Sequence, residues 1–121
     1  MAKAFKDFVQ EARQRIREVK VDDVRKKLEG NHPVVLVDVR EDSEWAKGHL
    51  PKAIHLGRGV IERDAGKLLP DAGAEIVCYC GGGSRSALAA DTLQQMGYKD
   101  VYSMDGGFGA WCESGLEVVK L

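Results

Sequence analysis

The sequence predicts one α/β domain in which a parallel sheet is covered by helices on both faces. Short aliphatic segments alternate with segments of helical periodicity along most of the chain, and parallel strands need such crossover helices between them. Val34–Val37 is continuously aliphatic, as expected for a strand that is buried on both faces. The length of 121 residues is that of one domain, so a second core is not expected.

Five short strands and four helices are expected in this domain. The strands fall at 19–21, 34–37, 53–56, 75–79 and 100–103, and the helices at 22–30, 43–47, 60–69 and 84–96. Asp22 and Ser84 are predicted as helix N-caps, because their side chains accept hydrogen bonds from free N–H groups of the first turn. Gly30 and Gly97 are predicted to end the first and the last of these helices.

Residues 1–18 are expected to add an amphipathic helix, over 4–17, ahead of the domain at 19–121. Packing on the domain explains its apolar stripe most simply, and a dimer or partner contact is the alternative. The apolar side chains recur every three or four residues, at Phe5, Phe8, Val9, Ala12 and Ile16.

Charge and composition exclude several classes of protein. The 18 Lys and Arg residues balance 19 Asp and Glu residues, so no strong field attracts nucleic acid or an anionic membrane. The longest aliphatic run is far shorter than the about 20 residues of a membrane-spanning helix, and the charged N-terminus does not resemble a signal peptide. Three cysteines cannot all pair internally, which favours a reducing compartment. We expect a cytoplasmic protein.

The most informative segment runs from a predicted buried strand into Cys80, three glycines and a helix. Gly81, Gly82 and Gly83 allow backbone conformations that turn successive N–H groups toward one atom, and here that atom is the Cys80 sulfur. The helix N-terminus and the charge of Arg85 also favour thiolate over thiol. The segment therefore predicts a nucleophilic cysteine.

Arg85 lies in the first turn of this helix, where a cation opposes the helix dipole by about 0.3 to 1 kcal/mol. An anion beside Arg85 would remove the conflict. The loop lacks the Lys followed by Ser or Thr of a Walker phosphate loop. A cysteine phosphatase loop has its arginine six positions after the cysteine, where this chain has Ser86. Neither phosphate-binding motif fits.

Three motifs together resemble the rhodanese-like family over residues 19–116. Cys80–Arg85 is similar to the family's six-residue loop, Cys-x-x-Gly-x-Arg. The second motif, Asp38–Pro51, contains Asp-Val-Arg, Glu-Trp and Gly-His-Leu-Pro, and the third, Asp105–Trp111, reads Asp-Gly-Gly-Phe-Gly-Ala-Trp. The resemblance implies a five-stranded parallel sheet and sulfur transfer through a persulfide on Cys80, with no metal or organic cofactor.

The resemblance also implies roles for the loop residues. Cys80 and Arg85 are expected to be catalytic, with a small-molecule sulfur donor and a thiol or cyanide as acceptor, or a protein as a further acceptor. The loop is of the short kind, which distinguishes it from related phosphatases whose loop is one residue longer. Substrate binding is assigned to the intervening residues Gly81, Gly82, Gly83 and Ser84.

The residue after Cys80 does not identify the sulfur donor. Thiosulfate-using relatives often have arginine there, whereas this chain has Gly81. A Cys-Gly opening resembles the mercaptopyruvate-using relatives, but those commonly have Thr or Ser where Arg85 stands. We expect thiosulfate to react with weak apparent binding, and low-molecular-weight persulfides to be used at least as efficiently.

Asp38, Arg40 and Glu44 are expected to support the loop rather than to react. Asp38 ends a predicted strand near the site, where it is expected to accept hydrogen bonds from the loop. Arg40 and Glu44 are four residues apart on a short helical turn, where they are expected to form an ion pair. Trp45 and Trp111 are predicted to anchor the core.

Cys78 lies two residues before Cys80 and therefore points the same way on an extended strand. A buried strand cysteine is the simpler interpretation, and a resolving thiol is the alternative. Only one residue separates the two cysteines, whereas zinc sites usually have two to four between paired cysteines, so no metal is predicted. The cysteine pair and the N-terminal helix keep a second function open, that of a persulfide carrier or redox-sensing module for one protein partner.

Overall fold

The computed structural model describes residues 2–120, which form one five-stranded sheet, six α-helices and a short 3-10 helix. The strands are β1 (Arg17–Val19), β2 (Val35–Asp38), β3 (Ile54–His55), β4 (Glu75–Tyr79) and β5 (Asp100–Met104). The helices are α1 (Phe5–Arg15), α2 (Val21–Glu29), α3 (Asp42–Ala46), η1 (Arg58–Val60), α4 (Ile61–Leu68), α5 (Ser84–Gln95) and α6 (Gly107–Glu113).

All five strands are parallel, in the order β1-β5-β4-β2-β3, which confirms the predicted sheet. The central strand β4 pairs with β2 on one side and with β5 on the other. Because parallel strands end at the same edge, the residues that follow β2, β4 and β5 lie side by side. In such sheets ligands bind at this carboxyl edge.

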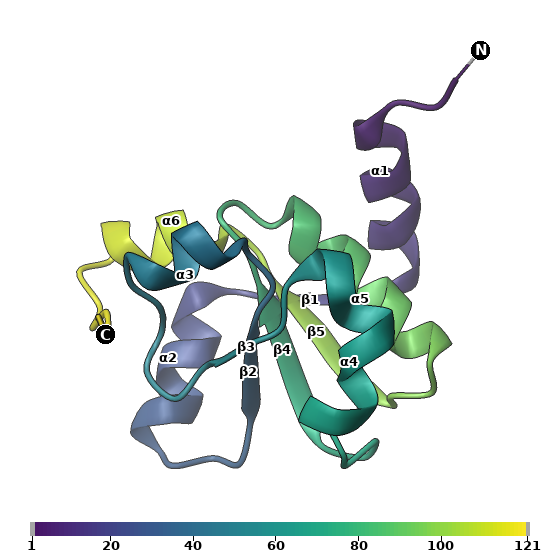
Figure 1. Cartoon of the computed structure of the whole chain (residues 1–121). Helices are drawn as coiled ribbons and strands as arrows, with labels where there is room; N and C mark the ends of the chain where they lie inside the picture. Colours follow the sequence, from purple (N-terminus) through teal and green to yellow (C-terminus); the bar gives the residue numbers. More distant parts are fainter. Residues whose placement is uncertain (1, 121) are drawn as a thin grey trace.

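Helices cover both faces of the sheet, as predicted (Figure 1). α1, α4 and α5 pack together on one face, whereas α2 and α6 cover the other. Side chains along β4 alternate between two apolar cores. Ile76 and Cys78 face the α4 and α5 layer, and Val77 and Tyr79 face the α2 and α6 layer. Cys80 continues the first set, so Cys78 and Cys80 lie on the same side, as the two-residue spacing predicts.

The first strand begins two residues earlier than predicted. α1 ends at Arg15, and β1 pairs Arg17 with Tyr102 of β5, where the guanidinium lies 4.3 Å from the centre of the tyrosine ring. α2 then begins at Val21, and its N-cap is Lys20 rather than Asp22. The Lys20 N–H donates instead to the Asp23 carboxylate over 3.0 Å.

α6 is a helix that the sequence analysis did not predict. Its residues Gly-Phe-Gly-Ala-Trp have poor helix propensity because glycine disfavours the helical backbone. Hydrogen bonds to the neighbouring loop, described below, hold its first turn. Among residues 2–120, no helix is long and apolar enough to cross a membrane.

Candidate active site

Cys80 lies at the carboxyl end of the central strand β4 and is only 1% exposed. Its sulfur accepts the N–H of Gly83 over 3.1 Å and the N–H of Ser86 over 3.3 Å. The Cys80 Sγ and Ser86 Oγ atoms are 3.5 Å apart and share a hydrogen bond. The backbone of the loop and of the first turn of α5 thus surrounds the sulfur with donors.

These donors decide the charge state of the thiol. Burial raises the pKa of Cys80, because the low-dielectric interior disfavours a charged sulfur. Hydrogen bonds from the Ser86 hydroxyl and from the N–H groups of Ser86, Gly83 and Gly82 favour the thiolate and outweigh burial, so the pKa is lowered from its usual value. For Cys78, burial and the neighbouring Cys80 raise the pKa to about 12.

Only one of the three loop glycines uses the left-handed backbone that glycine favours. Gly83 has φ +109°, whereas neither Gly81 nor Gly82 has a positive φ. Gly83 is also the N-cap of α5, a role that the sequence analysis gave to Ser84, which is instead the first helical residue. The left-handed turn at Gly83 aims its own N–H at the sulfur and starts α5.

Ser86 contributes to the site although the sequence analysis gave it no role. It is buried, its N–H and hydroxyl both reach the Cys80 sulfur, and its Oγ lies 2.8 Å from Ser103 Oγ on β5. The sequence could have indicated Ser86, because it lies in the first turn of the helix that follows the loop. N–H groups in the first turn have no partner within the helix.

Arg85 is paired with the carboxylate of Glu44. Arg85 Nη1 lies 2.7 Å from Glu44 Oε1 and Nη2 lies 3.1 Å from Oε2. Hydrogen bonding to Arg85 lowers the pKa of Glu44 to about 2. The expected ion pair between Arg40 and Glu44 is therefore wrong. α3 places Glu44 over the loop, where it neutralises the cation in the first turn of α5.

Arg40 instead forms a buried pair with Asp38. Arg40 Nη2 donates to Asp38 Oδ2 over 2.8 Å and to the Gly48 carbonyl over 2.7 Å. Tyr79 Oη donates to Asp38 over 2.7 Å and accepts the Leu50 N–H over 3.1 Å. Asp38 thus accepts from Arg40 and Tyr79, rather than from the loop as expected, and the network ties β2 and β4 to the segment that follows α3.

The N-terminus of α6 supports the Cys80 loop through hydrogen bonds to its backbone carbonyl groups. Phe108 donates its N–H to the Cys80 carbonyl over 2.7 Å, and Gly109 donates to the Gly81 carbonyl over 3.0 Å. Gly107 makes this approach feasible, because a Cβ at this position would lie 2.5 Å from the Cys80 carbonyl oxygen. The loop is therefore fixed by its own strand, by α5 and by α6.

The remaining predicted residues lie outside this arrangement. Trp111 is 2% exposed and anchors the α2 and α6 core as predicted. Trp45 is half-buried instead and stacks on His49, with ring centroids 3.5 Å apart, because α3 lies at the surface. Cys112 is exposed, and all three cysteines are free. No group of three or more His, Cys, Asp or Glu side chains among residues 2–120 could hold a metal ion.

A parallel sheet with a buried cysteine at the end of its central strand defines an α/β protein whose cysteine thiol is held by backbone hydrogen bonds and has a lowered pKa. The sequence model of the rhodanese-like domain matches residues 20–114, and the chain belongs to this family.

Solved structures agree with this assignment. A protein of unknown function and possible tyrosine phosphatase from Rhodopseudomonas palustris is similar, with 33% identity, a TM-score of 0.88, and coverage of 98% of this chain and 96% of the other. A rhodanese-like domain protein from Staphylococcus aureus has 31% identity, a TM-score of 0.73, and coverage of 87% and 100%. A thiosulfate sulfurtransferase from Pseudomonas aeruginosa has 30% identity, a TM-score of 0.78, and coverage of 87% and 20%.

Proposed function

We propose that this protein is a sulfurtransferase that carries a sulfane sulfur on Cys80. The observation that carries this proposal is one buried sulfur that accepts the N–H groups of Gly83 and Ser86 and shares a hydrogen bond with the Ser86 hydroxyl, an arrangement that lowers its pKa. Family membership and the similarity to a thiosulfate sulfurtransferase support the same reaction. The three free cysteines support a reducing compartment, and we place the reaction in the cytoplasm.

The first displacement loads the cysteine. The Cys80 thiolate attacks the outer sulfur of thiosulfate, a new S–S bond forms, and the S–S bond of the donor breaks. Sulfite leaves with the bonding electron pair, and the Cys80 persulfide anion remains. A persulfide donor reacts in the same way and releases its thiolate. Total charge is unchanged and no electron acceptor is needed.

The second displacement unloads the cysteine. An acceptor thiolate, or cyanide, attacks the terminal sulfur, and the Cys80 thiolate leaves with the electron pair. The products are the acceptor persulfide or thiocyanate. The N–H groups of Gly83 and Ser86 stabilise the negative Cys80 sulfur in the unloaded enzyme and again when it becomes the leaving group. Arg85 stabilises the donor and the leaving group through the part of its guanidinium that is not bound to Glu44, since one third of its side chain is exposed.

The structure gives little support to Cys78 as a resolving thiol. Its side chain is fully buried and its pKa is about 12, so it is not an attacking thiolate near neutral pH. The carrier interpretation therefore depends on a protein acceptor and not on an internal disulfide. Steady-state turnover with thiosulfate and cyanide, compared with transfer to a protein thiol, separates an enzyme from a carrier.

The test of the proposed function is the loading of each cysteine variant. Intact mass spectrometry after thiosulfate treatment is expected to show one additional sulfur atom on the parent chain and none on Cys80→Ser. Cys78→Ser and Cys112→Ser are matched controls that should load normally. Turnover by Cys80→Ser, or loss of loading only in the two controls, would refute the role of Cys80. Hydrolysis of p-nitrophenyl phosphate by the unloaded protein would instead favour a phosphatase.

A further inference from the structure

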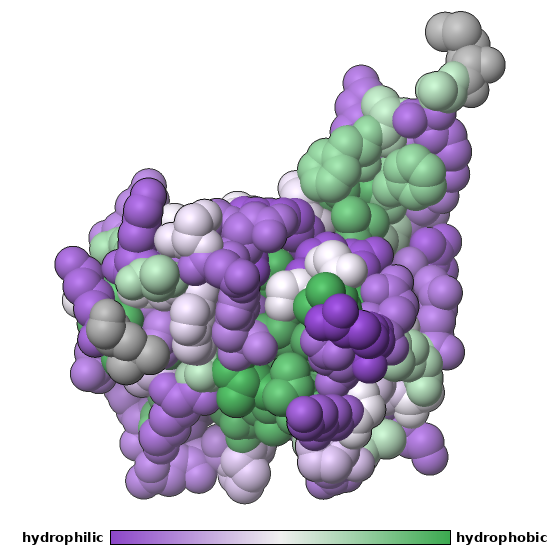
Figure 2. All heavy atoms as spheres, viewed as in Figure 1, coloured by the Kyte–Doolittle hydropathy of each residue, from purple (hydrophilic) through white to green (hydrophobic). Residues whose placement is uncertain are grey.

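The first half of α1 projects beyond the carboxyl edge of the sheet, beside the loop that holds Cys80 (Figure 1). Val9 and Ala12 are buried, and α1 packs on α5. Phe5 and Phe8, from the same apolar stripe, remain 57% and 49% exposed. Figure 2 shows their end of the helix as a hydrophobic projection above the body of the domain. We call Phe5, Lys6, Phe8 and Arg13 the α1 overhang.

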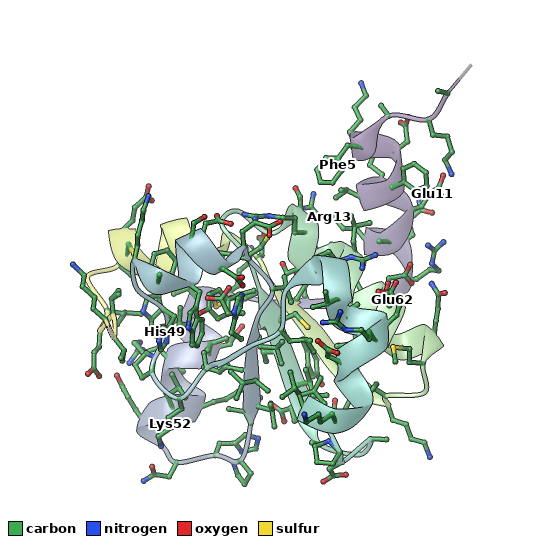
Figure 3. All side chains as sticks on the ribbon, in the orientation of Figure 1. Phe5, Glu11, Arg13, His49, Lys52 and Glu62 are labelled. Carbon is green, nitrogen blue, oxygen red and sulfur yellow. The ribbon has the colours of Figure 1, made fainter. Side chains whose placement is uncertain are left out.

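The α1 overhang is continuous with the loop. Arg13 reaches the loop itself, since its Nη2 atom lies 3.6 Å from the position that a Cβ on Gly83 would take. In Figure 3, Phe5 and Arg13 extend from α1 on the side toward the domain, whereas Glu11 extends away from it. Phe5 lies eight residues before Arg13, which is about 12 Å along a helix axis. An extended peptide segment can therefore contact Phe5 and the loop together.

The charges of the α1 overhang indicate the chemistry of that ligand. Lys6 and Arg13 are seven residues apart and so lie on the same side of the helix. Lys6 makes no ion pair with any residue from 2 to 120. Arg13 makes one long ion pair, in which its Nε lies 3.6 Å from Glu18 Oε2. The acidic side chains of α1 have local partners, because Glu11 pairs with Lys3 and Asp7 accepts the Ala4 N–H. The surface is thus apolar and basic.

The exposed area argues against a second copy of this chain as the occupant. The two phenylalanines expose about 100 Å² each, given the 150 to 250 Å² of an aromatic side chain. A symmetric contact would bury about 400 Å² of these side chains, whereas a stable interface needs about 1,200 Å² or more. Such a surface suits a weak and transient contact, which is what an acceptor of transferred sulfur requires.

We propose that the α1 overhang docks a protein that receives the sulfur from Cys80, through a segment in which a cysteine is flanked by acidic and apolar side chains. The apolar side chains cover Phe5 and Phe8, the acidic side chains face Lys6 and Arg13, and the acceptor thiol reaches the terminal sulfur at the loop. This proposal rests on the proposed function, because it names the acceptor class for the second displacement.

The experiment compares acceptors on protein that has already been loaded. The probes are a short peptide with one cysteine between two acidic and two leucine residues, the same peptide with lysines in place of the acids, and 2-mercaptoethanol. Phe5→Ser combined with Phe8→Ser is expected to slow transfer to the acidic peptide by about tenfold. Transfer to 2-mercaptoethanol and loading by thiosulfate should not change. Lys6→Glu should reverse the preference between the two peptides at low salt, and less so at high salt.

Met96→Ser is the matched control, because Met96 is an exposed apolar side chain after the far end of α5. Its transfer rates should equal those of the parent chain. If the Phe5→Ser, Phe8→Ser variant transfers sulfur to the acidic peptide as fast as the parent chain does, the docking proposal is overturned, as it is by a dimer in sedimentation that this variant dissociates.

A binding measurement separates failure of docking from failure of the proposed function. A peptide with serine in place of its cysteine cannot take sulfur, but it should still perturb the NMR signals of residues 5–13 in the unloaded protein. If Cys80 cannot be loaded at all, the proposed function fails while this binding can persist. If loading succeeds and no perturbation occurs, the docking proposal fails alone.

Discussion

Two glycine-rich turns lie side by side in this molecule and use their N–H groups for different purposes. The Cys80 loop, Cys80–Arg85, connects β4 to α5, and the Asp105 turn, Asp105–Phe108, connects β5 to α6. In the first, the Gly83 N–H points at the Cys80 sulfur, as does the N–H of Ser86 just after the loop. In the second, the Phe108 N–H points at the Cys80 carbonyl, and the N–H of Gly109 just after the turn points at the Gly81 carbonyl.

The two turns also differ in how strictly they need glycine. Gly83 is the only left-handed residue of the Cys80 loop, and a Cβ there would make only ordinary contacts. Gly106 and Gly107 of the Asp105 turn are both left-handed, and a Cβ on either would lie within 2.7 Å of another atom. The Asp105 turn therefore requires glycine more strictly than the Cys80 loop does.

Gly107→Ala should have the largest effect, because the new Cβ meets the Cys80 carbonyl oxygen at 2.5 Å and the Gly81 carbonyl carbon at 2.8 Å. Neither backbone atom can move without shifting the loop. We expect unfolding in urea to show a loss of about 3 kcal/mol or more, from overpacking and the left-handed backbone together. Gly59→Ala, where nothing lies within 4 Å, is the control and should change little. A loss below about 1 kcal/mol for Gly107→Ala would contradict the comparison.

Gly83→Ala should have a smaller effect that comes from conformation alone. A left-handed backbone costs an L-residue about 1 to 2 kcal/mol, and no steric clash is added at this position. The matched variant Gly82→Ala adds a Cβ in open space without a positive φ and should be neutral in stability. Urea unfolding of both variants tests this prediction. Equal losses in the free energy of unfolding would show that Gly83 is no more strictly required than Gly82.

Ser86→Ala should weaken the thiolate without breaking the loop, because the backbone donors at Gly83 and Ser86 remain. A hydrogen bond to a charged group is worth roughly 1.5 kcal/mol, so iodoacetamide alkylation of Cys80 at pH 6 should slow by about tenfold.

The pH dependence of Cys80 alkylation shows the direction in which the pKa changes. In the parent chain the lowered pKa of Cys80 keeps the thiolate populated below the pH at which free cysteine protonates, so the alkylation midpoint should lie below that of glutathione. In Ser86→Ala the midpoint should move upward. Ser103→Ala removes the partner of the Ser86 hydroxyl but not a sulfur contact, and serves as the control. A parent midpoint at or above that of glutathione would disprove the donor arrangement.

Gly81→Arg should have the smallest effect and concerns the donor. The backbone at Gly81 accepts a side chain, but Arg85 Nη2 lies 3.2 Å from the new Cβ and must move slightly. A second cation should increase kcat/KM for thiosulfate, which is doubly charged, more than for a persulfide. Repulsion from Arg85 limits the gain to about threefold, less than the one to two powers of ten of a full charged hydrogen bond. Mass spectrometry first verifies that Cys80 of the variant loads normally. Steady-state kinetics then measures kcat/KM for thiosulfate relative to kcat/KM for a persulfide. If kcat/KM for thiosulfate does not increase, charge at position 81 does not select the donor.

Local sequence determined the sheet and the loop. A continuous aliphatic run such as Val34–Val37 predicts a buried strand from neighbouring residues alone. The segment from Glu75 to Arg85 likewise forms one strand, one turn and the start of one helix in direct succession. Cys78 and Cys80 could be assigned to one side of β4 for the same reason. The predicted strand at 19–21 was displaced by two residues from β1 because the bounds of β1 depend on its pairing with β5, in which Arg17 lies opposite the distant Tyr102.

Only the tertiary structure decided the partners of the charged groups and the support behind the loop. Glu44 pairs with Arg85, which is 41 residues away, because α3 lies over the loop, whereas helical spacing suggested Arg40. α6 forms in a glycine-rich segment because its first N–H groups bind the carbonyls of Cys80 and Gly81. Local sequence specifies backbone conformation through interactions between neighbouring residues. Ion pairs and hydrogen bonds between distant segments form only when the chain packs, because each group then binds the partner that packing brings nearest.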